Sequence, residues 1–314
     1  MIKTRRRTLI GKIEAVEGVA ENLQAADGGI IASDTNWVPD IKMLQRNAAT
    51  ASLSKLPDIP GLALGQISFR AEMMGRTTAF AAGNKPYVSP FLRACGFAET
   101  VVVTAGQEKV TYAPASTGVP SLTLSLFTDG VIKQLVGARG NVKFMGVVGE
   151  QLWAEFTFMG AFVEPTDGAI VTPTFPTHIP PRCLNASLAV GAFTPVVRGF
   201  SIDMQNKLAP REDVNSPTGY KSFMLTDRDP RGNFDPEMEL VATHPWYGRW
   251  RAGTTAALSL GPIGTDQYNR VKLTAPKLLY TKVAQADREG NEIANTDFQL
   301  AMASGDDELV IEFS

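Results

Sequence analysis

Apolar and polar residues alternate along many stretches of the chain, so that every second side chain is apolar. Alternation of this kind runs through residues 67–73, 122–126, 156–158, 200–204, 238–242, 298–302 and 309–313. A period of two places one row of side chains in a core and the other row in solvent, as in a strand of an antiparallel sheet. Clusters of Gly, Pro, Asn and Asp separate the stretches, as turns do. The pattern therefore predicts a mainly β fold of antiparallel strands.

Helical periodicity is scarce, and one short helix is predicted within residues 86–97, PYVSPFLRACGF. Ser89 is of a residue type that caps helix N-termini, Pro90 suits the first helical turn, and Gly96 suits the end of the helix.

A pattern near residue 150 recurs at the end of the chain. The strand pair at 142–156 is joined through Gly149, and a similar pair at 298–313 is joined through Gly305. Further matches follow in the same order: 67–73 with 237–243, 92–96 with 250–253, and 109–114 with 270–276. We interpret the shared order as one β unit used twice.

A proline-rich stretch, VTPTFPTHIPPRC at 171–183, lies where a linker between two such units would be expected. Proline stiffens a linker and cannot donate a hydrogen bond to a central strand ladder. We expect an N-terminal β domain at residues 1–178 and a C-terminal β domain at residues 179–314.

The composition is that of a folded chain with little net charge. A formal net charge of −2 over 314 residues argues against a strongly basic nucleic-acid binder or a membrane-surface binder. No run approaches the ~18 apolar residues needed for a membrane span, and the basic start lacks the apolar segment of a signal peptide. Cys95 and Cys183 do not have the spacing of a disulfide framework or a metal site. We expect a chain made in a cytoplasm, with reduced thiols and no membrane partner.

The sequence offers little catalytic or metal-binding chemistry. Its two histidines, His178 and His244, have no partner at a spacing typical of a metal site or a catalytic triad. The Asp-rich segment 226–235 resembles a calcium loop only superficially, because a proline and two arginines interrupt the ligand spacing. Glu155 and Asp203 are the best candidates for paired catalytic carboxylates, although charges on the wet face of a sheet need no such role. We predict no catalytic residue, no cofactor and no metal.

One segment, HPWYGRWRAG at 244–253, concentrates aromatic side chains and arginines. Such side chains stack on nucleobases, but they also anchor subunit contacts. Because the chain is nearly neutral, we favour the second role. The predicted subunit-contact residues are Trp246, Tyr247, Arg249 and Trp250.

Five motifs of the first two hundred residues carry a resemblance. They are IEAVEGVAENLQAADGGIIASDTNWVPD at 13–40, SPFLRACGF at 89–97, EKVTYAPAS at 108–116, TDGVIKQLVGARGNVKF at 128–144 and WAEFTFMGAFVEP at 153–165. Together they resemble the major tail tube proteins of siphophages, and the second half resembles the family mainly through its repeat of the first. The resemblance implies a mainly β fold with two tandem tail-tube-type β-barrel or sandwich domains, each with one short flanking helix.

The resemblance also implies a function: a structural virion protein that polymerises into stacked rings and so forms the tail tube. Strands of neighbouring subunits would join around a lumen, through which the tape measure protein and later the DNA pass without specific DNA binding. Because single-domain members form six-fold rings, two domains in one chain predict a homotrimer with pseudo-six-fold symmetry. The tail terminator and the distal tail protein are further expected partners. The expected location is the virion tail, assembled in the host cytoplasm.

Loops that contact the next ring in the family have two expected counterparts here. After the first strand of the second copy, residues 206–222 are too many for a simple hairpin turn. By analogy, the predicted inter-ring contacts are Arg211, Glu212, Asp213 and Tyr220 in this loop, and Leu53, Leu56 and Ile59 in the first copy. The sequence does not identify the strand faces that line the lumen. Arg70, Glu72 and Asp203 are candidates for residues on such a face.

Two other classes of function fit the same alternation. A two-domain β-sandwich binding module, such as an adhesin, a baseplate protein or a capsid decoration protein, would stay monomeric or form a closed oligomer. A β-rich hydrolase would need a carboxylate pair such as Glu155 and Asp203 in a cleft rimmed by aromatic side chains. Growth of tubes at rising concentration separates the first class from a tail tube protein, and activity on glycans separates the second.

Overall fold

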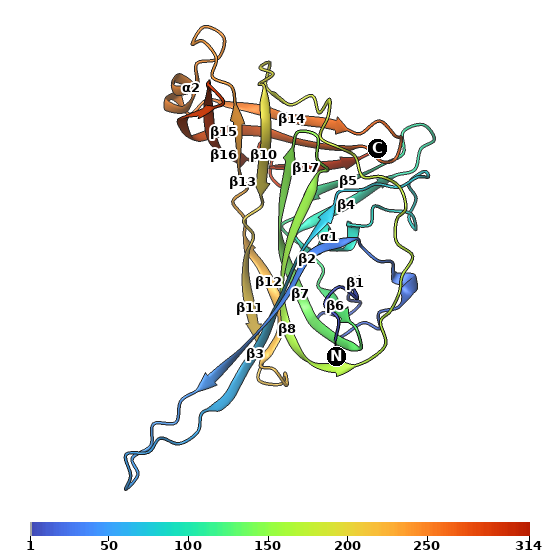
Figure 1. Ribbon diagram of the computed structural model, residues 1–314, viewed down its shortest axis with the longest axis vertical. Helices are drawn as coiled ribbons and strands as arrows, with labels where there is room; N and C mark the ends of the chain where they lie inside the picture. The colour runs from blue at the N-terminus through green and yellow to red at the C-terminus, as the bar shows by residue number, and fades with distance from the viewer. Residues whose placement is uncertain (1) are drawn as a thin grey trace.

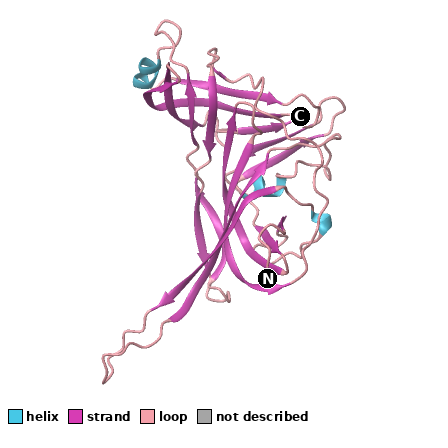
Figure 2. Cartoon of the chain, viewed as in Figure 1, coloured by secondary structure: helices cyan, strands magenta, loops and turns pink. Residues whose placement is uncertain are grey.

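The computed structural model describes residues 2–314, and its regular secondary structure is mostly strand, joined by long loops (Figures 1 and 2). The first half contains β1 (Arg7–Ile13), β2 (Ala32–Leu44), β3 (Ile59–Glu72), β4 (Phe97–Val102), β5 (Lys109–Pro114), β6 (Leu122–Thr128), β7 (Val131–Val147) and β8 (Trp153–Asp167). The second half contains β9 (Ala189–Val190), β10 (Val197–Asp203), β11 (Lys207–Glu212), β12 (Tyr220–Asp227), β13 (Arg231–Pro236), β14 (Thr255–Ile263), β15 (Val271–Arg288), β16 (Asn291–Ala301) and β17 (Val310–Phe313). The helices are the 3-10 helix η1 (Ala25–Asp27), α1 (Ser89–Ala94) and α2 (Trp246–Ala252). The predicted mainly β class, with a short α-helix in each half, is confirmed.

All strands except β11 and β12 belong to one antiparallel sheet. Neighbouring strands follow the order β2-β3-β8-β7-β10-β13-β16-β15-β17-β5-β4, and β1, β6, β9 and β14 attach to this path from the side. The path has two ends, β2 and β4. The expected barrel is therefore not closed within one chain.

The two halves of this sheet have the same connectivity. Strands of the first half pair in the order β1-β6-β7-β8-β3-β2, and strands of the second half pair in the order β9-β14-β15-β16-β13-β10. Corresponding strands follow each other in the same order along the chain, and α1 and α2 fall at the same place in that order. The matching connectivity is what a repeated β unit would give, while the domain boundary at 178/179 stays a prediction.

The strand pairing at the end of the chain differs from the predicted repeat. The first expected hairpin, β7·β8, is present, but β16 and β17 do not pair with each other, because β17 lies between β15 and β5. Asp307 stabilises the change of direction, since it accepts hydrogen bonds from the backbone N–H groups of Ala303 and Ser304, both at 3.0 Å. The alternation located both strands correctly but assigned the wrong partner to β17.

A second expectation fails just before α2. Residues 237–243 alternate in the sequence, yet apart from an isolated bridge of Glu237 to Ile293 they form no strand, and residues 241–243 are a turn that leads into the helix. The N–H of His244 donates to the carbonyl of Leu240 at 2.9 Å and closes this turn. Leu240 and Val241 are each 78% exposed, so no second layer faces them. Alternation without a surface to bury against does not make a strand.

The polar loop expected at 206–222 is mostly a hairpin of β11 and β12. Its turn is closed by Asp213, whose N–H donates to the carbonyl of Gly219 at 2.9 Å and whose carboxylate accepts the N–H of Asn215 at 2.9 Å. Strand β12 packs against β7 and β8. The loop is therefore an ordered element rather than a mobile connection.

One hydrophobic core runs through both halves. In the first half, Phe69, Phe91, Phe156 and Phe158 form an aromatic cluster with ring centroids 5.2 to 6.1 Å apart. The buried residues continue without a break into the second half, as far as Phe298 and beyond. Because the core is shared and β7 pairs directly with β10, the two halves form one body.

Helix α1 lies where the sequence predicts it, but its N-terminal cap differs. Val88 is the capping residue, and Ser89 begins the helix and donates its hydroxyl to Glu99. Cys95, the residue after α1, is buried and free, as is Cys183 in the proline-rich segment.

Candidate assembly surfaces

The hairpin of β2 and β3 projects from the body of the molecule (Figure 1, lower left). We call residues 41–60 of this hairpin the arm. Its exposed apolar side chains are Ile41, Met43, Leu44, Leu53 and Ile59, with exposed fractions from 43% to 105%. Exposed apolar side chains grouped on one projection are typical of an interaction site. The predicted inter-ring residues Leu53 and Ile59 thus lie exposed on one element together with the half-buried Leu56, while their contact with another ring stays a prediction.

The β11–β12 hairpin lies beside the base of the arm. The N–H of Ala63, on β3, donates to the carbonyl of Thr218 at 3.1 Å. Gly219 has a φ of 77°, a backbone conformation that favours glycine, and a Cβ atom there would also meet the end of the Leu62 side chain. The arm therefore starts from a base that is fixed on one side.

Glu17 fastens the β11–β12 hairpin to the first half of the chain. Its carboxylate accepts hydrogen bonds from Arg139 at 2.7 Å, from Arg211 at 2.7 Å and from Ser222 at 2.8 Å. Burial by itself would raise the pKa of Glu17, but the hydrogen bonds from Arg139, Ser222 and Arg211 outweigh it and lower the pKa to about 2. The hairpin is thus held by a carboxylate that stays ionised at neutral pH.

The four predicted contacts in this hairpin have different environments. Arg211 is engaged by Glu17, and its side chain is 37% exposed. Tyr220 is buried against Phe223, with ring centroids 6.0 Å apart. Glu212 is exposed, whereas Asp213 is half-buried and accepts hydrogen bonds from Asn215. Of the four residues, Glu212 is the one whose side chain is most open to another molecule.

Among the strand edges that have no partner within residues 2–314 are those of β2 and of the second half of β15. Strand β2 pairs with β3 on one side only. Strand β15 pairs with β14 up to Leu279, and beyond Tyr280 it pairs with β16 alone. Unpaired edges are templates for strand addition by another chain.

The aromatic segment at 244–253 separates into buried and exposed side chains. Trp246 is buried, whereas Tyr247 and Trp250 are exposed to 48% and 38%. Helix α2 ends at Gly253, whose φ of 63° is the left-handed conformation that suits a C-terminal glycine. As surface contacts, Tyr247 and Trp250 stay predictions. Arg249 is half-buried, with its guanidinium over the Tyr280 ring at 6.0 Å.

His244 lies under α2 and is also buried. Its ring stacks on Phe193 with the centroids 4.0 Å apart, and Nε2 lies 3.1 Å from the hydroxyl of Tyr280. Burial, with a smaller contribution from the positive charge of Arg249, lowers the pKa of His244 to about 4.

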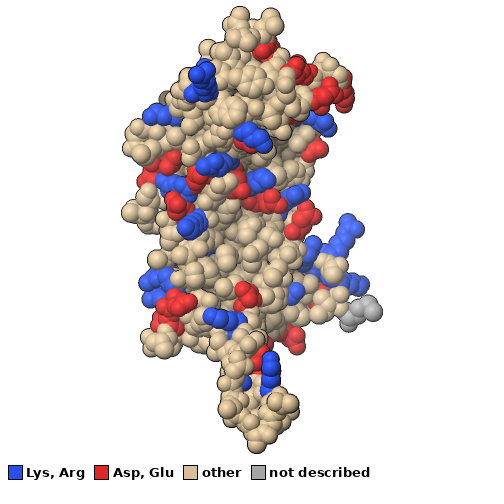
Figure 3. Space-filling view, turned by 90° about the vertical axis from the view of Figure 1, so that its left-hand side faces the viewer, with Lys and Arg blue, Asp and Glu red and all other residues tan. Residues whose placement is uncertain are grey.

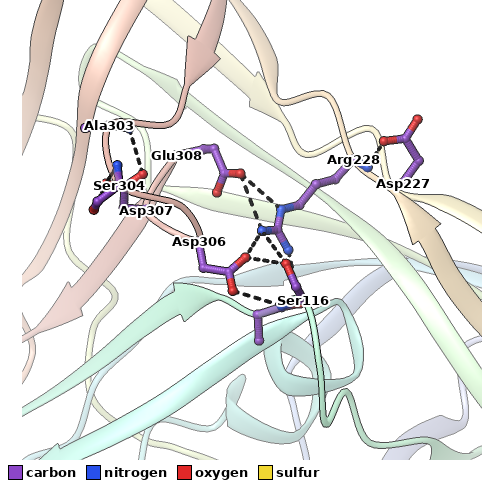
Figure 4. A network of polar contacts seen from close by, with 9 residues as sticks. Ser116, Asp227, Arg228, Ala303, Ser304, Asp306, Asp307 and Glu308 are labelled. Carbon is purple, nitrogen blue, oxygen red and sulfur yellow. Dashed lines mark hydrogen bonds and ion pairs between the residues drawn. The ribbon is translucent and has the colours of Figure 1, made fainter.

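The Asp-rich segment 226–235 contributes an arginine rather than a calcium loop (Figure 4). Arg228 is nearly buried and forms ion pairs with Asp306 and Glu308. It also donates to the carbonyl of Ala115 at 3.0 Å, and Ser116 donates to Asp306 at 2.6 Å. Arg228 therefore links three segments that are far apart in the sequence. Within residues 2–314, no group of three or more His, Cys, Asp or Glu side chains could hold a metal ion.

The two candidate catalytic carboxylates lie on a flat sheet face. Glu155 on β8 contacts Arg70 at 3.4 Å, and Asp203 on β10 accepts a hydrogen bond from Asn141 at 2.7 Å. Strand β7 lies between the two strands. Both acids are thus engaged by neighbours, and a strand separates them.

Sequence reasoning missed Glu17 and Arg228, which hold the assembly surfaces in place. Glu17 is separated from Arg139 by 122 positions and from Arg211 by 194. Arg228 is separated from Asp306 by 78 positions. No local pattern in a single sequence signals pairs at such distances. An ion pair between residues so distant in the sequence can be recognised only once the fold is known.

Comparison with known proteins identifies the family. The chain matches the family model described as phage tail tube protein over residues 13–300, which includes both halves. No curated protein sequence gives a comparable match. Among residues 2–314, none of the helices has the length and apolar character needed to cross a membrane. The chain belongs to the phage tail tube protein family, and it is therefore a structural subunit that assembles with copies of itself into the tube of a virion tail.

Proposed function

We propose that three copies of this chain close into each ring of the tail tube. One observation carries the proposal: the two halves have the same strand connectivity and are joined side by side through β7 and β10. In the shared pattern β10 corresponds to β2, and β7 corresponds to β15. The same kind of join between chains would pair β2 of one copy with the second half of β15 of the next.

The free edges support this closure. Strand β2 has no partner on its outer side, and β15 has none beyond Leu279 on the side of β14. Each chain would contribute the eight strands from β2 to β15 on the sheet path, and three chains would give three times eight, or 24, strands. A closed ring covers the free edges of β2 and β15, which otherwise invite uncontrolled pairing. The ring would then have pseudo-six-fold symmetry.

We further propose that stacked rings form the conduit for the tape measure protein and for DNA during ejection. The arm and the β11–β12 hairpin occupy corresponding places in the two halves, since each lies between the second and third strands of the shared pattern along the chain, β2 and β3 or β10 and β13. The arm and the β11–β12 hairpin would both contact the adjacent ring. The tail terminator and the distal tail protein are the proposed partners at the two ends of the tube.

A catalytic role is not part of this proposal. The hydrolase alternative finds no support, because Glu155 and Asp203 are engaged by Arg70 and Asn141 on an open sheet face. An adhesin, baseplate or decoration module would have no use for two complementary free edges at opposite ends of a repeated pattern.

Electron microscopy of the purified chain, imaged end-on at low and high concentration, tests the proposal. We expect hollow rings with three chains each, stacked into tubes that lengthen as the concentration rises. Native mass spectrometry of rings released at low concentration gives the number of chains independently. Rings of six complete chains would refute the trimer while leaving the tube intact. Compact monomers at every concentration, even with a tail tip complex as nucleus, would refute both.

A further inference from the structure

The open face of the long sheet carries a row of charged side chains that crosses neighbouring strands. The paired registers place five charged residues directly opposite one another, strand by strand: Arg70 on β3, Glu155 on β8, Lys143 on β7, Asp203 on β10 and Arg231 on β13. Asp34 on β2 extends the row, since its carboxylate contacts Arg70 at 3.4 Å. We call these six residues the charge row.

The sign of the charge alternates at every step of the charge row, so its three acids and three bases sum to zero. Glu155 also contacts Arg70, at 3.4 Å, and at the other end Arg231 contacts Asp229 at 2.7 Å, which adds one further acid. The side chains stay accessible, with Arg70 exposed to 43% and Glu155 to 36%. Figure 3 views the side of the molecule that is on the left in Figure 1, and it shows positive and negative side chains interspersed across the middle rather than gathered in patches.

Alternation at this spacing almost cancels the electric field a short distance above the sheet. Neighbouring strands are about 4.8 Å apart, so the sign repeats about every 10 Å. The field of such a periodic array decays over roughly its repeat divided by 2π, or about 1.5 Å, which is far shorter than the Debye length of about 8 Å at physiological salt. A phosphate group a few ångströms above the side chains would therefore experience little net attraction or repulsion.

We propose that this face is the wall that double-stranded DNA meets inside the tube, and that the charge row keeps the DNA from binding to it. The inference rests on the proposed function, in which DNA passes through the ring. A row of unopposed arginine and lysine side chains would bind phosphates and hold the DNA. A row of unopposed acids would repel it from the lumen. The balance of positive and negative charges in the charge row depends on both halves of the chain, because the row crosses from β7 to β10.

Fluorescence anisotropy of a labelled duplex of about 20 base pairs with the dispersed chain tests the charge row directly. We expect no binding by the unaltered chain at low salt. The variant Glu155→Gln/Asp203→Asn removes two acids, so that the three bases of the charge row face only Asp34 and, at its end, Asp229. It should bind the duplex, with a slope of log affinity against log salt of about −1 to −2.

Two further variants separate the row from the total charge. Asp58→Asn/Glu289→Gln changes the net charge by the same amount at exposed positions outside the row, and it should not bind. Adding Lys143→Gln and Arg231→Gln to the first variant restores the balance and should abolish binding again. The single variant Glu155→Gln serves if Asp203→Asn impairs folding, because Asp203 also accepts the Asn141 amide. Binding by the unaltered chain, or equal binding by Asp58→Asn/Glu289→Gln, would overturn the proposal.

A labelling experiment tests whether this face lines the lumen. Ser201 lies on β10, two residues before Asp203 and on the same face. The variant Ser201→Cys is labelled with biotin–maleimide, and the native thiols Cys95 and Cys183 are buried. Streptavidin should bind the dispersed chain labelled at residue 201 but not the outside of assembled tubes. A Thr104→Cys control in the exposed β4–β5 turn should also bind streptavidin when dispersed, which checks the labelling and the detection. Tubes decorated through residue 201 would refute the wall assignment. A failure to form tubes would count against the proposed function, and the duplex measurement on the dispersed chain would still decide the charge row.

Discussion

Two glycines and one carboxylate allow β12 to approach the first half of the chain closely. A Cβ atom at Gly18 would lie 2.5 Å from the carbonyl oxygen of Lys221, and a Cβ atom at Gly137 would lie 2.7 Å from the same oxygen. Both glycines have positive φ angles, 78° and 62°. The buried carboxylate of Glu14 accepts the N–H of each glycine, at 2.8 and 2.7 Å. The hairpin thus docks on bare backbone, at positions where any side chain would cause both strain and collision.

The burial of His244 makes the stability of the chain depend on pH. Its pKa is about 4 in the folded chain and about 6.5 in an unfolded one. The unfolded chain therefore binds a proton between these values while the folded chain does not. The stabilisation is complete above pH 6.5 and is lost as the pH falls toward 4. We expect the free energy of unfolding to fall by about 2 kcal/mol between pH 6.5 and pH 5.

Urea titrations at these two pH values measure this dependence. The variant His244→Gln should be less stable at pH 7 but should show a flatter change between pH 6.5 and pH 5. His178→Gln removes the other histidine, which is half-buried, and should keep most of the change. An unaltered pH dependence in His244→Gln would show that His244 is not its source.

At the scale of elements, the arm groups five exposed apolar side chains on one projecting hairpin. We expect that replacing residues 45–58 by a two-residue Asn-Gly turn leaves the paired part of β2 and β3 intact. Rings should still form, since the proposed closure uses the edges of β2 and β15. Stacking into tubes should be lost or strongly reduced, as measured by sedimentation and electron microscopy.

A milder version of the experiment uses point substitutions. Leu53→Ser/Ile59→Ser should weaken stacking in the same direction. Leu240→Ser/Val241→Ser removes an equally exposed apolar pair outside the arm and should have no effect on tube length. Normal tubes from the chain without residues 45–58 would contradict a stacking role for the arm.

The sequence predicted individual elements better than their partners. Strands such as β3 and β7 were predictable because one face of each is buried, which imposes a period of two on the sequence. The β7·β8 hairpin was predictable because its two strands are adjacent in the chain. The pairing of β17 with β5 was not, because about 200 residues separate the partners and strand registers at that distance leave no local signal.

The assembly surfaces were predictable in part. Leu53 and Ile59 were assigned by analogy with the family to a loop that contacts the next ring, and the structure brings them together on the arm. Tyr220 and Trp246 were expected at a surface, yet both are buried. The sequence pattern around an aromatic residue in a polar segment is the same whether the side chain packs in a core or contacts a partner. Only the packing of the surrounding elements distinguishes a buried position from an exposed one.

At the scale of the whole molecule, Arg228 joins the connection between β12 and β13 to residues of both the first half and the chain end. The variant Arg228→Ala would leave the largely buried Glu308 without its cation. We expect a loss of about 2 to 3 kcal/mol in the free energy of unfolding. For a chain of this size, the melting temperature should fall by about 2 to 4 °C per kcal/mol.

Scanning calorimetry with a matched arginine checks this expectation. Arg231→Ala removes an exposed ion pair with Asp229, and exposed pairs contribute about 0 to 1 kcal/mol. Both variants should unfold in a single transition, because the two halves share one core. A second transition in Arg228→Ala would mean that this residue, rather than the core, couples the halves.

The shared core, the β7·β10 join and the Arg228 contacts leave the chain without a hinge between its halves. If the arms contact the next ring as proposed, bending of the tube is taken up at those contacts rather than within a subunit. Such a tail would bend between rings rather than within them, and its lumen would keep the same width where the tail curves.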